Sequence, residues 1–166
     1  MLTRLPRSRD SVRGVLACRR GNTAVEFGLT VPLLVLLAFG AFDYGSAYVE
    51  SVRLNGAARA GAQQALYNAQ NWQNTDQMEQ TALEEYAGHA LTPDEIALMS
   101  VSATANAFCA CTAGVTLACT GTCPSGESPG QFVSVVLNNA VPLTLPYPWA
   151  AGETVQVDGQ AVVRVR

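Results

Sequence analysis

A single acidic residue stands at the start of a long apolar stretch. Glu26 is followed by sixteen residues without a charge, Phe27 to Phe42. A carboxylate inside hydrocarbon costs on the order of 3 kcal/mol or more unless it is paired, so such a residue is a functional hypothesis by default. If the chain is cut after Gly21, the new amine of Asn22 lies about 6 Å from Glu26 along a helix axis. A neighbouring subunit shifted along that axis could place its amine against this carboxylate. A glutamate at the level of the lipid head groups is the alternative.

Four cysteines form the second group with chemical potential. They lie within fifteen residues, at Cys109, Cys111, Cys119 and Cys123, and the fifth, Cys18, lies in the N-terminal head. An exported domain with an even number of cysteines favours disulfides, whereas zinc is opposed by the C-x-C and C-x3-C spacings. Three pairings are open. The nested one, Cys109 with Cys123 and Cys111 with Cys119, fits a hairpin best.

A third pattern imitates a hydrolase. Gly126 to Gly130 reads G-x-S-x-G, but a nucleophile elbow needs a strand before the serine and a helix after it. A Cys-Pro loop precedes this serine and a strand-like run follows. The one histidine, His89, lies upstream, where that fold does not place it. We therefore expect no catalysis, no cofactor and no metal site.

The charges are divided unevenly along the chain. Residues 1–21 hold six arginines against one acid, a net charge of +5, and residues 22–166 hold four arginines against twelve acids, a net charge of −8. A basic segment before an apolar run is held on the cytoplasmic side of a membrane. No basic surface follows it, so nucleic-acid binding is not expected. Residues 22–43 are then a transmembrane helix, and residues 44–166 lie outside the cytoplasm.

Helical spacing of apolar residues continues beyond the apolar run. It predicts one helix from residue 22 to about Asn68, with Tyr44 and Tyr48 at the membrane interface. The small residues 56–62 suit packing either against other helices or against the protein's own sheet. Thr75 and Asp76 can cap a second helix with the body Gln77 to His89.

From Ile96 onward the sequence favours strands. Apolar and polar residues alternate from 96 to 107, and three further segments read as strands: 115–119, 132–137 and 154–165, the last with a turn or bulge at Gly159. The prolines of 142–149 predict an irregular extended segment. Helices followed by strands indicate an α+β fold. We expect a small antiparallel sheet of three or four strands with a disulfide-stapled loop.

The N-terminal pattern resembles a known family. A basic leader, a glycine, a glutamate five residues later, an aromatic residue and an apolar run with an early proline look like a class III signal cut by prepilin peptidases. The fuller pattern resembles the TadE-like pseudopilins of tight-adherence (Flp) pili, most strongly over residues 19–66. It comprises residues 20–27, Pro32, Gly40, Asp43, Tyr44 and residues 57–62. Asp43 stands where glutamate is more usual.

The resemblance implies roles for individual residues. Gly21 and Asn22 would flank the processing site, and Glu26 and Phe27 would act in recognition and assembly. Residues 1–21 would be a cleaved leader. The protein would be a minor pilin or assembly factor of the inner membrane, with the N-terminus cytoplasmic. Its partners would be a prepilin peptidase, other pilin subunits and the assembly machinery. The competing interpretation is a membrane-anchored periplasmic binding domain, with 142–149 as its contact surface, or an anchored enzyme.

Overall fold

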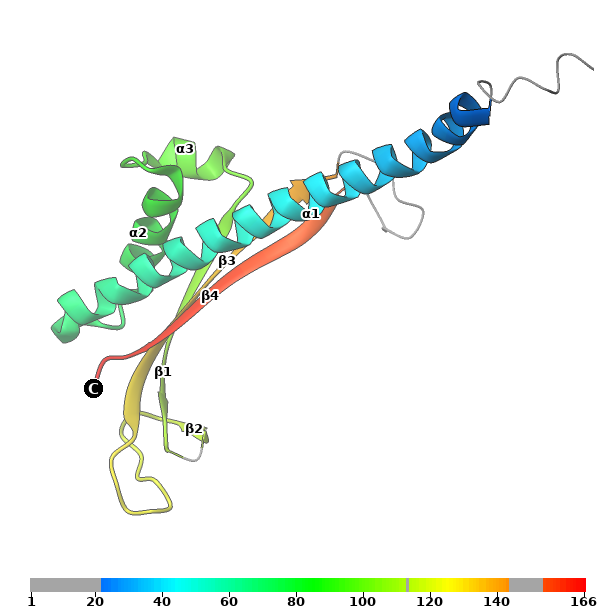
Figure 1. Ribbon diagram of the computed structural model, residues 1–166. Coiled ribbons are helices and arrows are strands. Elements are labelled where there is room, and N and C mark those ends of the chain that lie inside the picture. The colour runs from blue at the N-terminus through cyan, green and yellow to red at the C-terminus, as the bar shows by residue number, and fades with distance from the viewer. Residues whose placement is uncertain (1–21, 113, 144–153) are drawn as a thin grey trace, which may run out of the picture. The chain divides into compact units, whose positions relative to one another are not determined.

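The computed structural model describes residues 22–112, 114–143 and 154–166 of the 166-residue chain. Contacts divide the chain into two compact units, Met1–Phe42 and Asp43–Arg166. Helices precede strands in the order of elements, as Figure 1 shows. Most of the segment 142–149, the expected contact surface of an anchored binding domain, lies outside the described residues.

One helix dominates the N-terminal half. Helix α1 (Asn22–Tyr67) has 46 residues and ends one residue before the predicted position. It continues through Pro32, which can donate no backbone hydrogen bond. The hydroxyl of Thr30 donates to the backbone oxygen of Glu26 at 3.0 Å, a bond within the helix itself. A short 3-10 turn, η3 (Ala69–Asn71), follows.

The second helix is close to the predicted one. Helix α2 (Thr75–Ala87) begins two residues before the predicted body, and its cap is Asn74 rather than Thr75 or Asp76. The side chain of Asn74 accepts a hydrogen bond from the Gln77 amide at 3.4 Å. Gly88 ends the helix in the left-handed region, at φ 79°, where glycine has no Cβ to strain.

A third helix replaces the predicted start of the first strand. Helix α3 (Pro93–Leu98) covers the first residues of the alternating run, so the predicted strand at Ile96 is wrong. Thr92 and Glu95 form a capping box, in which the Glu95 carboxylate accepts from the Thr92 amide at 2.8 Å. These hydrogen bonds from Thr92 lower the pKa of Glu95. The cap therefore directs these residues into a helix despite the alternation of apolar and polar residues, and the strand begins only at Ser102.

Four antiparallel strands form the sheet, in the order β2-β1-β3-β4. This agrees with the predicted α+β fold and its three or four strands. Strand β3 is longer than predicted at both ends, because its partners continue the ladder: Gly130 pairs with Ala110, and Pro142 pairs with Thr154. The strands are β1 (Ser102–Ala110), β2 (Thr116–Leu117), β3 (Gly130–Pro142) and β4 (Thr154–Arg164).

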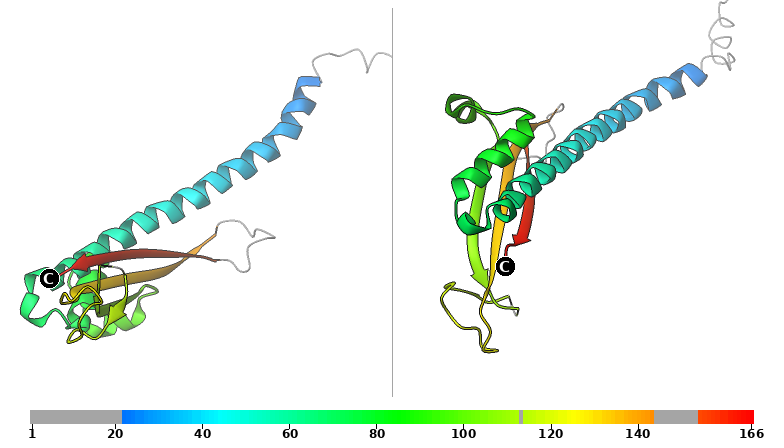
Figure 2. Two further views of the ribbon diagram at one scale, coloured as in Figure 1. Left: turned by 90° about the horizontal axis from the view of Figure 1, so that it is seen from below. Right: turned by 90° about the vertical axis from the view of Figure 1, so that its left-hand side faces the viewer.

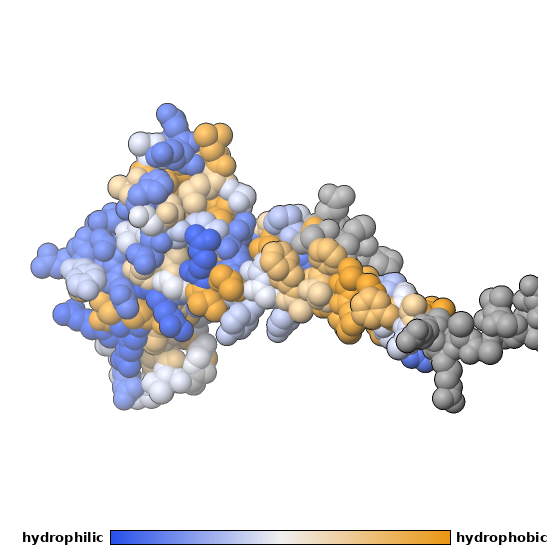
Figure 3. Space-filling view, turned by 45° about the horizontal axis from the view of Figure 1, so that its top comes forward, coloured by the Kyte–Doolittle hydropathy of each residue, from blue (hydrophilic) through white to orange (hydrophobic). Residues whose placement is uncertain are grey.

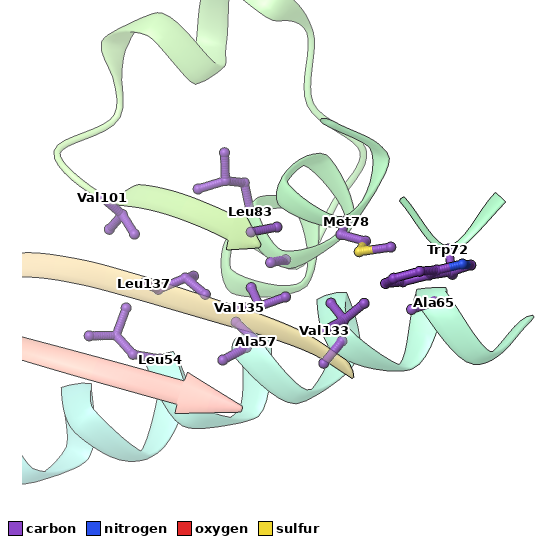
Figure 4. Packing of buried hydrophobic residues seen from close by; sticks show 14 of the residues in the cluster. Leu54, Ala57, Ala65, Trp72, Met78, Leu83, Val101, Val133, Val135 and Leu137 are labelled. Atoms are coloured by element: carbon purple, nitrogen blue, oxygen red, sulfur yellow. The ribbon is translucent and has the colours of Figure 1, made fainter. Parts of the chain in front are cut away.

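The core of the second unit lies between one face of the sheet and the helices, which lie on the same side of it (Figure 2, right). In β3 the buried residues alternate, at Val133, Val135 and Leu137, as a sheet with one covered face requires. Leu54 and Ala57 of α1 pack near this strand (Figure 4).

The small residues of α1 serve this packing. Ala57, Ala58, Ala62 and Ala65 are all buried. A Cβ on Gly61 would lie 2.7 Å from the Met78 carbonyl oxygen of α2. Of the two roles that the sequence left open for residues 56–62, close packing within the protein's own domain is thus the one seen for the buried positions.

Candidate functional site

The predicted processing segment is described only in part. Gly21 lies outside the described residues, and the described part of α1 begins at Asn22. Glu26 and Phe27 follow within the first two turns, and both are exposed. The Phe27 side chain is 69% exposed, which leaves an aromatic ring uncovered within its unit.

The first unit is apolar on its surface. Most of its large side chains, from Val25 to Phe42, are exposed, and this part of the helix is mostly orange in Figure 3. Among the described residues, α1 is the helix that is long and apolar enough to span a membrane. Its apolar stretch is 0% buried. An exposed apolar surface of this size is typical of a segment that contacts lipid or another protein. The helix is therefore a candidate membrane anchor.

Helix α1 also exposes an apolar surface in the second unit. Tyr44, Tyr48 and Val52 are 78%, 62% and 56% exposed. Their spacing of four places them along one side of the helix. Val52 lies nine residues after Asp43, about 14 Å along the helix. A Cβ on Gly45 or Gly56 would meet nothing within 4 Å, so the backbone there is open to close approach.

The four clustered cysteines form two disulfides, as predicted, but with a different connectivity. Cys109 bonds to Cys119, and Cys111 bonds to Cys123. The nested pairing is wrong because of the hairpin register. Cys109 pairs with Leu117, and the Cys111 amide donates to Val115. This register brings Cys119 beside Cys109. Cys111 then bonds to Cys123, in the loop that leads to β3.

The structure places the G-x-S-x-G segment before a strand. Ser128 is exposed in a loop, and β3 begins two residues later at Gly130. His89 is exposed, and its Nδ1 lies 2.9 Å from the Ala90 carbonyl oxygen. The strand–serine–helix arrangement of a nucleophile elbow is thus not formed here.

Sequence reasoning missed a polar cluster that joins three elements. Tyr86 of α2 donates its hydroxyl proton to Glu50 of α1 at 2.5 Å, and Asn139 of β3 donates to the same oxygen at 2.7 Å. Arg53 lies over the Tyr86 ring, 4.8 Å from its centroid, and forms an ion pair with Glu50 at 3.6 Å. Burial, and then the neighbouring Glu50 carboxylate, raise the pKa of Tyr86.

Little in the sequence distinguished this cluster. Tyr86 is partly buried against the core, as an aromatic residue of an amphipathic helix is expected to be, so its hydroxyl group did not stand out. The signal that could have found it is the pair Glu50 and Arg53, an i, i+3 pair within a stretch that is otherwise uncharged from Tyr44 to Ala58. The cluster binds the two helices to the sheet, so its evident role is to hold the second unit together.

The comparisons with known proteins bear on the first part of the chain. Residues 21–63 match the family described as TadE-like protein. This segment contains the predicted processing and assembly residues, the apolar run and the exposed tyrosines. No curated protein and no solved structure matches the chain. The similarity to this family therefore lies in the helix that is the candidate membrane anchor.

Proposed function

From the premise that the chain is TadE-like over residues 21–63, we propose that it is a minor pilin or an assembly factor of a tight-adherence pilus. Residues 1–21 form a basic leader on the cytoplasmic side, residues 22–43 span the inner membrane, and residues 44–166 form the extracytoplasmic α+β domain. The observation that carries the proposal is the family match, which lies on the exposed apolar helix.

A prepilin peptidase cuts the chain between Gly21 and Asn22 in this proposal. The new amine of Asn22 then lies about 6 Å along the helix axis from Glu26. In an assembly of parallel helices, a subunit shifted along the axis places its amine against the Glu26 of its neighbour. An ion pair formed in this way would stabilise the assembly, because opposite charges attract strongly in hydrocarbon.

The exposed face of α1 in the second unit supports a structural role. Tyr44 and Tyr48 suit the interface between membrane and water. Val52 is about 14 Å along the helix from Asp43, too far to share that interface if Asp43 marks the end of the span. Its exposed side chain is then available for contact with another pilin subunit in this proposal. The second unit acts by binding and carries out no reaction of its own.

The direct test is the N-terminus of the mature protein. The protein is isolated from cells with and without a prepilin peptidase, and its mass and N-terminal sequence are determined. We expect a chain that begins at Asn22 in the first case and one that retains the leader in the second. A chain with its leader in both cases would overturn the processing proposal.

The role of Glu26 is tested separately by Glu26→Ala. We expect normal cleavage and membrane insertion but fewer pili, counted by electron microscopy. Thr23→Ala, on the same exposed helix end, is the matched control and should leave the pilus count unchanged. Normal pilus numbers in the Glu26→Ala strain would show that the carboxylate has no part in assembly.

A further inference from the structure

A cavity of about 530 Å³ lies where the disulfide loop meets the sheet. Phe108 of β1, Phe132 of β3 and Arg164 of β4 line it, and they occupy paired positions of the ladder. Side chains alternate between the faces of a sheet, and Val133 points into the core, so these three side chains lie on the face away from the helices. The proposed pilus role does not account for this cavity.

The apolar part of the cavity is built from aromatic rings and sulfur. Phe108 and Phe132 are stacked, with centroids 5.7 Å apart. The disulfide of Cys111 and Cys123, whose residues are both buried, forms a rigid part of the lining. A Cβ on Gly130 would lie 3.0 Å from the Phe132 ring, so the glycine lets this ring lie close to the strand.

The polar part of the cavity holds one acid and one base. Among the described residues, the Glu127 carboxylate has no ion-pair or hydrogen-bond partner. Arg164 lies over the Phe132 ring, and its Nε donates to the Arg166 carbonyl oxygen at 3.1 Å. This bond holds the guanidinium and leaves its two terminal nitrogens to donate to a ligand.

Three residues that carry hydroxyl groups complete the lining: Thr112, Thr116 and Ser128. Each can both donate and accept a hydrogen bond. With one acid and one base the cavity has no net charge, so it does not favour an anion or a cation. It offers donors, acceptors and aromatic carbon in a volume that is ordinary for small-ligand sites.

We propose that this cavity binds an uncharged carbohydrate of one or two sugar rings. Sugar hydroxyls both donate and accept, which matches Glu127, Arg164 and the three hydroxyl side chains. The C–H faces of a sugar ring are apolar and slightly positive, and they pack on the negative face of an aromatic ring such as Phe108. A zwitterionic amino acid would also match Glu127 and Arg164, so it is the competing ligand that the test includes.

The test uses the full chain, with both disulfides formed, in micelles of a detergent that carries no sugar. Saturation-transfer NMR is recorded with glucose, galactose, N-acetylglucosamine, lactose and cellobiose, each added separately. Phenylalanine and citrate are the zwitterionic and anionic probes. We expect ring protons of at least one sugar to receive saturation, and neither charged probe to do so. Binding by no sugar of the panel, or by phenylalanine or citrate instead, would overturn the proposal.

Variants then locate the binding. Arg164→Gln and Glu127→Gln should each raise the dissociation constant of the bound sugar at least about tenfold, because each removes a charged hydrogen-bonding group. Both side chains are on the surface, so the fold should be retained. Arg59→Gln, exposed on α1 and outside the cavity, is the control. Unchanged affinity in both cavity variants would place the sugar elsewhere and refute the site.

Discussion

The backbone of β4 at Gly159 lies directly against the backbone of α1 at Leu54. A Cβ on Gly159 would lie 2.5 Å from the Asn55 amide nitrogen and 2.6 Å from the Leu54 Cβ. The strand is unbroken there, since Gly159 pairs with Leu137, and the turn or bulge predicted at this glycine is wrong. The neighbouring Gln160 amide donates to the Asn55 side chain at 3.3 Å. The glycine is needed for helix and strand to approach, not for the strand to bend.

Replacing this glycine should therefore destabilise the second unit. Gly159→Ala places a methyl group against helix backbone, which cannot move aside as a side chain can. We expect a loss of about 2 kcal/mol or more in the free energy of unfolding, as for overpacked cores. Guanidinium unfolding of the full chain in micelles, followed by tryptophan fluorescence, measures it.

The matched control is Gly56→Ala. Gly56 lies in α1, and a Cβ there would meet nothing within 4 Å. Alanine favours a helix over glycine by up to about 1 kcal/mol, so this variant should be as stable as the natural protein or more so. Equal stability of the two alanine variants would show that the contact of Gly159 with Leu54 is looser than described.

The bond between Tyr86 and Glu50 predicts a dependence on alkaline pH. The pKa of Tyr86 is raised above the ordinary value near 10, chiefly by burial and then by Glu50. A group whose pKa is raised by folding contributes stability that is full below its unfolded pKa and is lost as pH rises through its folded pKa. The free energy of unfolding should therefore fall above about pH 10.

Tyr86→Phe tests the source of this fall. The variant should lose about 1 kcal/mol at neutral pH, the usual contribution of such a hydrogen bond, and should show a smaller fall above pH 10. Tyr67→Phe, at a side chain 86% exposed, is the control and should behave as the natural protein. If Tyr86→Phe retains the full alkaline fall, another group is responsible.

Local patterns predicted most of the elements. The apolar spacing predicted the end of α1 to within one residue, and the alternation of apolar and polar residues predicted the strands β1 and β4. These signals are repeated over many residues, so a single exception does not hide them. Thr92 and Glu95 show where repetition misleads, because a capping box of two residues directs the next six into a helix.

Long-range relationships were beyond such patterns. The partner of Cys119 depends on the register of β1 with β2, which a shift of two residues would change. The partner of Glu50 is 36 residues away on another helix. A glycine in a strand indicates a turn, a bulge or the close approach of another element, and the sequence does not show which of these requires it. These features depend on tertiary packing, which spacing along the chain does not encode.

The disulfide connectivity can be checked by paired substitution. Replacing Cys109 and Cys119 by serine should leave Cys111 and Cys123 bonded, and replacing Cys111 and Cys123 should leave the other pair bonded. In each variant we expect a loss of about 2–3 kcal/mol, as for short loops, and no free thiol apart from Cys18. Thiol titration of the unfolded protein measures this.

The contrasting variant replaces Cys109 and Cys123 by serine. It breaks both bonds of the described connectivity, so two further thiols should be free when the protein is folded under oxidising conditions. If instead this variant were as stable as the two matched pairs and had no additional free thiol, the nested connectivity would be favoured.

The last prediction concerns the exposed side of α1. Val52 is 56% exposed in the second unit, so a glutamate there costs the fold little, but in a contact between helices it would bury a charge without a partner. We expect Val52→Glu to keep normal protein levels, cleavage and unfolding stability and to reduce pili severalfold by electron microscopy. Gln63→Glu, an exposed polar position eleven residues further along the same helix, should leave pili unchanged. Because both variants add one negative charge to α1, a loss confined to Val52→Glu assigns the effect to contact at that side chain and not to net charge. Normal pilus numbers in the Val52→Glu strain would mean that this side of the helix faces water in the assembled pilus.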